Sequence, residues 1–201
     1  MDESNKYPHH VSSTENKQEK PPLPKRKTPR LQGFDYSIHG SYFVTIVTHH
    51  QQELFGIIEN GEMNLSASGR MILQVWDEMK KVFHTLLYPI ITVMPNHVHF
   101  IICILDDNKT YLSEVVRWMK SKTTHDYILG VKENGWPHFN GHLWQSRFWD
   151  RIIRNQREYD FVMNYIYENP RRWSKDKLCA HCGEETDDIN KKLNNHDYTL
   201  E

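Results

Sequence analysis

The sequence is poor in the features that mark secreted and membrane proteins. Three cysteines in 201 residues are an odd number and too few for a disulfide scaffold, so we expect a reducing, cytoplasmic environment. No apolar run approaches the ~18 residues that a membrane-spanning helix requires, and the N-terminus lacks the apolar segment of a secretory signal. The composition therefore predicts a cytoplasmic protein with no membrane partner.

The chain also lacks a net charge that would select a class of partner. Its formal net charge is −1, which argues neither for nor against nucleic acid. The charges are unevenly distributed, because residues 117–172 carry ten Lys or Arg against six Asp or Glu. A basic patch can therefore form locally within a neutral total.

Apolar residues are scarce as well, at 38% of the chain, so part of it should lie outside the core. Residues 1–30 are polar and end in a basic cluster, which predicts a disordered basic arm, either solvated or gripping phosphates. Residues 176–201 are again polar and acidic, as in a tail. One folded domain, residues 31–175, remains between them.

Strand and helix patterns mix within this domain. Strands are predicted at Tyr42–Thr48, on both sides of the turn Asn60-Gly61, at Ile90–Met94 and at His97–Leu105. Helices are predicted from Ser66 or Ser68 to Pro89, from Leu112 or Ser113, and from Asn155 to Asn169, with a loop at 130–141 and no clear state for 143–153. This mixture favours an α+β sandwich with a largely antiparallel sheet and helices on one face.

Two histidines open the most apolar predicted strand. Residues two apart in a strand point to the same face, so His97 and His99 should project side by side. Paired imidazoles form half of a metal site. The alternative is two ordinary histidines at a strand end, which the spacing alone favours in a chain with 13 His.

The last predicted helix places Tyr165 and Asn169 one turn apart on the same face. The phenol could reach a phosphate held by a metal, and the amide oxygen could join the metal's ligands. The alternatives are amphipathic packing for Tyr165 and a helix C-terminus for Asn169. Tyr167 lies on a different face and is the weaker nucleophile candidate.

Basic and aromatic residues interleave ahead of that helix. Cationic side chains that could grip a nucleic-acid strand are Arg117, Lys120, Lys122, Arg147, Arg151 and Arg154. Trp144, Phe148 and Trp149 could stack on unpaired bases, or could belong to the core. Cys179 and Cys182 have the spacing of a metal knuckle, but a structural zinc site needs four ligands, so we read the pair as a chance feature of the tail.

The segments VMPNHVHFII (Val93 to Ile102) and NYIYENPRRW (Asn164 to Trp173) resemble the single-tyrosine HUH transposases of the IS200-like family, specifically the REP-associated group. The similarity covers roughly residues 25–175. It implies a ferredoxin-like core and an HUH catalytic domain over 31–175. By this resemblance Tyr165 is the nucleophile, Asn169 the third metal ligand beside His97 and His99, and the substrate a stem-loop of palindromic repeats in single-stranded DNA.

The resulting hypothesis is metal-dependent nicking and strand transfer through a phosphotyrosine intermediate. Phosphate chemistry and a mixed nitrogen and oxygen site favour Mg²⁺ or Mn²⁺ over Zn²⁺. One alternative is a domesticated relative that binds DNA hairpins without cleaving them. Another, a zinc hydrolase, lacks a carboxylate ligand or base near the histidines. The sequence leaves open whether the protein is a monomer or a homodimer.

Overall fold

The computed structural model describes residues 40–105 and 110–179. The elements run in the order β1 (Gly40–Val47), η1 (His49–Gln51), β2 (Gly56–Glu59), β3 (Glu62–Leu65), α1 (Ala67–Val82), β4 (Leu86–Val93), β5 (His97–Ile104), α2 (Leu112–Asn134), β6 (Trp149–Ile153), α3 (Gln156–Glu168) and η2 (Pro170–Lys175). The predicted basic arm and most of the acidic tail, including Cys182, lie outside the described residues. Within those residues, no helix is both long and apolar enough to cross a membrane.

Four strands form the main sheet in the order β4-β5-β1-β6, and each neighbouring pair is antiparallel. With α1 and α2, they follow the chain order β1-α1-β4-β5-α2-β6, which with this strand order is the ferredoxin-like arrangement. The hairpin β2-β3 is inserted before α1, and α3 follows the core. The predicted α+β class with an antiparallel sheet is confirmed.

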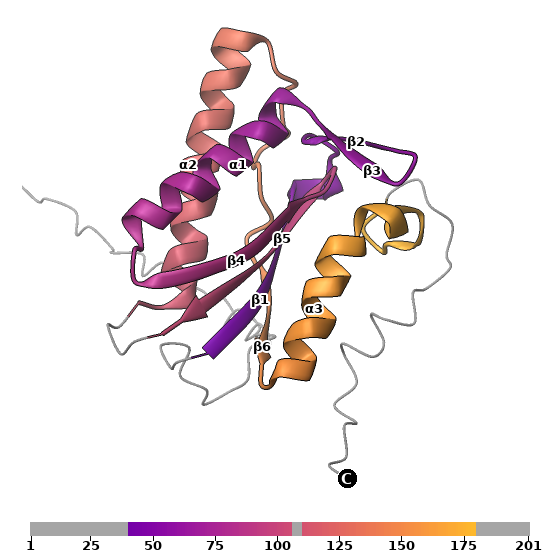
Figure 1. Cartoon of the computed structure of the whole chain (residues 1–201). Coiled ribbons are helices and arrows are strands. Elements are labelled where there is room, and N and C mark those ends of the chain that lie inside the picture. The colour runs from indigo at the N-terminus through magenta and orange to yellow at the C-terminus, as the bar shows by residue number, and fades with distance from the viewer. Residues whose placement is uncertain (1–39, 106–109, 180–201) are drawn as a thin grey trace, which may run out of the picture.

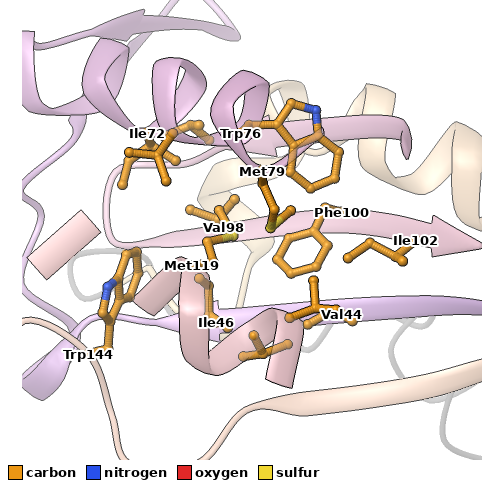
Figure 2. Close-up of a cluster of buried hydrophobic side chains, with 14 of the residues drawn as sticks. Val44, Ile46, Ile72, Trp76, Met79, Val98, Phe100, Ile102, Met119 and Trp144 are labelled. Carbon is orange, nitrogen blue, oxygen red and sulfur yellow. The ribbon is translucent and has the colours of Figure 1, made fainter. Parts of the chain in front are cut away.

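The helices cover both faces of this sheet, not one as predicted (Figure 1). Helices α1 and α2 pack on one face over a large apolar cluster that contains Val98, Phe100 and Ile102 of β5 (Figure 2). Helix α3 packs on the other face, where Val162 and Ile166 meet the opposite side of β5. The prediction failed because β5 is apolar on both faces, and its second apolar face needs a cover of its own.

Local signals set several boundaries correctly. Asn60 and Gly61 have φ of 54° and 77°, as the two-residue turn between β2 and β3 requires. The hydroxyl of Ser66 accepts a hydrogen bond from the Gly69 amide and caps α1. The side chain of Asn155 caps α3 in the same way, through the Glu158 amide.

The first predicted helix is too long. Helix α1 ends at Val82, and Leu86 belongs to β4, where it pairs with Ile104. Pro89 lies inside β4 and ends no helix. Proline is tolerated there because β4 is an edge strand and its register with β5 shifts between Leu87 and Ile90.

The predicted loop at 130–141 begins too early, since α2 continues to Asn134. Gly130 lies within the helix, where the Trp136 ring fills the space that a β-carbon would occupy. The residue that ends the helix is Gly135, in the left-handed conformation with φ of 65°. Gly130 is therefore explained by close packing against Trp136, and Gly135 ends the helix.

Candidate active site

The two predicted histidines lie side by side at the start of β5, on the face covered by α3. His97 is completely buried and His99 is 3% exposed. Their Nε2 atoms face each other at 3.0 Å. Two nitrogens bound at right angles to one cation, with bonds of ~2.1 Å, lie about 3 Å apart. The spacing of this pair fits a shared metal ion.

The other ring nitrogen of each histidine is held by a neighbour. Asn96 donates its amide protons to the carbonyls of Gln51 and Leu178, at 3.2 and 2.6 Å. Its Oδ1 is then the acceptor for Nδ1–H of His97, at 2.8 Å. This contact places the proton of His97 on Nδ1 and its ring lone pair on Nε2, as ligation requires. The Nδ1 atom of His99 meets Oγ1 of Thr45, also at 2.8 Å, and such partners orient metal-binding imidazoles.

Burial keeps both imidazoles uncharged. It lowers the pKa of His99 from 6.5 to about 3. Burial, and secondly the neighbouring His99, also lower the pKa of His97 well below its usual value. Neutral imidazole is the form that binds a cation, so the pair is ready for ligation at neutral pH.

Helix α3 brings Tyr165 over the histidines. Its ring centroid lies 5.4 Å from that of His99 and 5.9 Å from that of Phe43, and the side chain is 7% exposed. The placement follows from the amphipathic pattern, because Val162 and Ile166 anchor the same helix on Ile101. The other tyrosine of this helix turn, Tyr167, is 69% exposed and points away from the sheet.

Asn169 follows Tyr165 by one helical turn and is 2% exposed. Another turn on, Trp173 has its ring 5.8 Å from His97. This face of α3 and η2 thus runs along the histidine pair. Within the described residues, Oδ1 of Asn169 is the buried side-chain oxygen or nitrogen without a hydrogen-bond partner. An unpaired buried carbonyl oxygen costs roughly 1–3 kcal/mol, and a bound cation would remove that cost.

A carboxylate lies beside the histidine pair. The ligand atoms of His97, His99 and Asp176 all lie within 4.8 Å of one another. Asp176 directly follows η2 and also accepts a hydrogen bond from the Leu178 amide at 2.8 Å. Imidazole nitrogens together with amide and carboxylate oxygens form a donor set that suits Mn²⁺ and Mg²⁺.

His99 and Tyr165 open onto a cavity of about 330 Å³. Its lining includes His99, Tyr165, Arg151, Trp149 and Asp176. Of the cationic residues expected to bind DNA, Arg151 is the one that lines this cavity, and it lies 3.4 Å from Glu158. The cavity wall therefore combines the proposed nucleophile with one histidine of the pair, a carboxylate and a guanidinium group.

Four other expected DNA contacts belong to α2 and the core beneath it. Trp144 is 5% exposed, donates to Oγ1 of Thr123 and packs with the main apolar cluster, which favours core packing over base stacking (Figure 2). Lys120 donates to the carbonyls of Gln145 and Arg147, and burial lowers its pKa to about 8.

Lys122 pairs with Glu78 and Asp126 at 3.2 and 2.6 Å. Arg117 lies at the surface, 3.9 Å from Glu114. Arg154 is exposed, and Arg147 lines a second hollow with His49 and His142. DNA binding by these residues stays a prediction.

Sequence reasoning missed Asp176 and Asn96. The sequence pattern assigns Asp176 to the acidic tail, and only the course of η2 brings it to the histidines. Asn96 falls between two predicted strands, although its position directly before the first histidine was a usable signal. Thr45 was hidden because its partner, His99, lies on a different strand.

Comparisons with known proteins agree with this arrangement. The family model "Transposase IS200 like" matches residues 66–169. An uncharacterized protein of Haemophilus influenzae is 28% identical over 166 residues, which cover 76% of this chain and 92% of that protein. The REP-associated tyrosine transposase of Escherichia coli K12 is 32% identical over 78 residues, which cover 39% of this chain and 40% of that protein.

A solved structure of a REP-associated tyrosine transposase bound to a REP hairpin shares the fold. Its TM-score is 0.52 and its sequence identity 23%, over 70% of this chain and 73% of that one. The family match spans more than half of the chain and includes both histidines, Tyr165 and Asn169. The chain belongs to the IS200-like transposase family of DNA-processing enzymes and is a homologue of the REP-associated tyrosine transposases.

Proposed function

We propose that this protein nicks and rejoins single-stranded DNA beside a stem-loop, with Tyr165 as the covalent nucleophile. The observation that carries the proposal is the contact between the Tyr165 and His99 rings, at 5.4 Å, in a cavity that Arg151 also lines. The stem-loop is proposed by analogy with the related transposase whose structure holds a REP hairpin.

His97 and His99 would hold a divalent metal, Mg²⁺ or Mn²⁺, with oxygen donors from Asn169 and Asp176. The orphaned oxygen of Asn169 and the nearby carboxylate support this ligand set. When bound, such a cation offsets the charge of the phosphate that is attacked. Asn96 and Thr45 keep the imidazoles in the orientation that ligation needs.

The bond exchange is balanced. The phenol oxygen of Tyr165 forms a bond to phosphorus, and the bond from phosphorus to the 3′ oxygen breaks. The phenol loses its proton and the departing 3′ oxygen gains one, so no net charge is created. Attack by a 3′-hydroxyl on the phosphotyrosine reverses these changes and rejoins a strand. Burial of Tyr165 against Phe43 holds the ring in place for both steps.

The test is cleavage of a stem-loop oligonucleotide with single-stranded flanks, labelled at either end. With Mn²⁺ or Mg²⁺, the 5′-labelled strand should shorten and the 3′-labelled strand should migrate as a protein adduct on a denaturing gel. Tyr165→Phe should abolish both products, and Tyr167→Phe, which alters the exposed tyrosine, should keep both. An adduct that persists in Tyr165→Phe would reject this nucleophile. Wild-type protein that binds the hairpin but leaves it intact with either metal would favour the non-cleaving alternative.

A further inference from the structure

Trp149 is the largest side chain that the sheet leaves exposed, with 63% of its surface accessible. It begins β6, an edge strand of the sheet. Indole rings are enriched at binding interfaces, because they combine a large apolar face with a polar N–H group. The core-packing alternative that holds for Trp144 therefore does not hold for this residue.

The strand register places Trp149 in line with the histidine pair. Trp149 pairs with Thr45 on β1, and Thr45 pairs with His99 on β5. Paired residues in neighbouring strands project on the same face of a sheet, so the indole lies on the α3 face. Two strand spacings, about 10 Å, separate its backbone from that of His99.

The indole and the reacting groups also line one cavity. Trp149, Arg151, His99 and Tyr165 all contribute to its wall. Arg151 is two residues further along β6, and therefore on the same face as the indole. An exposed aromatic ring beside a guanidinium group is the combination with which proteins hold single-stranded nucleic acid, because every base offers a face for stacking and every linkage a negative charge.

We propose that Trp149 is a stacking platform for one unpaired base next to the phosphate that Tyr165 attacks. The proposal rests on the proposed function and adds to it a subsite for a nucleobase. Stacking tolerates any base, so Trp149 fixes the position of the strand and leaves sequence choice to other contacts. Arg151 lines the same wall of the cavity, where its guanidinium group lies 3.4 Å from the Glu158 carboxylate.

The experiment measures binding of the stem-loop oligonucleotide by fluorescence anisotropy, with Mn²⁺, in the Tyr165→Phe background so that the strand stays intact. Each flanking nucleotide is replaced in turn by an abasic one. With Trp149 present, one abasic position should weaken binding roughly 5- to 150-fold, the range for loss of one stacked base. Trp149→Ala should show a loss of similar size with the intact strand and no additional loss at that position. Trp149→Phe should bind nearly as well as Trp149.

Trp149→Leu keeps an apolar side chain without a stacking face and should behave like Trp149→Ala. Tyr167→Ala removes an equally exposed aromatic ring, 69% accessible, and should bind as before. The proposal would be overturned by a Trp149→Ala protein whose binding is still weakened at every sensitive abasic position. It would also be overturned by a change in the molar mass of this protein in light scattering, because such a change would place the indole between two copies of the chain. Failure of the Tyr165→Phe protein itself to bind the strand would instead refute the proposed function and this inference together.

Discussion

The buried histidine pair should make the protein unusually sensitive to mild acid when no metal is bound. His99 is 3% exposed, and burial lowers its pKa to about 3. In the unfolded chain the same imidazole has a pKa of about 6.5. Between these two values the unfolded state binds a proton that the folded state does not, so the free energy of unfolding falls as pH falls below 6.5.

The size of the effect follows from the shift. One proton costs about 1.4 kcal/mol per pH unit, so His99 alone should lower the free energy of unfolding by about 2 kcal/mol between pH 6.5 and pH 5. His97 acts in the same direction, since burial lowers its pKa as well. Above pH 6.5 both states carry neutral imidazoles, and this contribution vanishes.

Urea unfolding in the presence of EDTA, followed by tryptophan fluorescence at pH 7.5 and pH 5.0, measures this loss. His99→Gln should reduce the difference between the two pH values by about 2 kcal/mol, because one of the two titrating groups is gone. His138→Gln, a change at an exposed histidine, should keep the full difference. A His99→Gln protein with the same acid sensitivity as the wild type would show that the imidazole is not buried uncharged, and the reasoning would fail.

Two further predictions concern packing and the metal ligands. Gly130→Ala should lower the free energy of unfolding by roughly 1–3 kcal/mol, because the new methyl group would meet the Trp136 ring within 2.5 Å; urea unfolding measures this, and an unchanged midpoint would contradict it. Asn96→Ala should weaken Mn²⁺ binding roughly 10- to 100-fold, since His97 loses the acceptor of its Nδ1 proton. Isothermal titration calorimetry checks this, with Asn64→Ala at an exposed position as the control, and equal affinity in the two variants would refute it.

The sequence predicts most of the fold where the signal is local. The apolar run of β5, the turn at Asn60-Gly61 and the caps at Ser66 and Asn155 depend on neighbours within a few residues, and each lies where expected. The prediction that Pro89 ends a helix was wrong because a proline is also tolerated in an edge strand. Whether a strand lies at an edge is decided only by the assembled sheet.

The parts of the candidate site that could not be predicted from the sequence depend on contacts between residues far apart in the chain. Spacing predicts that His97 and His99 share a face, and helical periodicity predicts the same for Tyr165 and Asn169. Neither pattern says that the two faces meet. The contact depends on the apolar half of β5, since Ile101 and Cys103 continue the histidine face and pack against α3. Asp176 could not be placed without the direction of η2.

The apolar contacts on this face of the sheet therefore also determine where the side chains of the candidate site lie. If α3 slid by one turn along β5, Asn169 would take the place of Tyr165 beside His99, and the phenol would leave the histidine pair. Val162 and Ile166 oppose such a slip because they are buried against Ile101, and the backbone carbonyl of Ile166 accepts a hydrogen bond from Thr92 at 3.2 Å. Thr92 pairs with His99 across the strands, so this bond fixes the helix at the same level of the sheet as the imidazole. The hydrophobic contacts thus set the position of Tyr165, the proposed nucleophile, and precise placement of reacting groups is where much of a catalyst's rate enhancement originates.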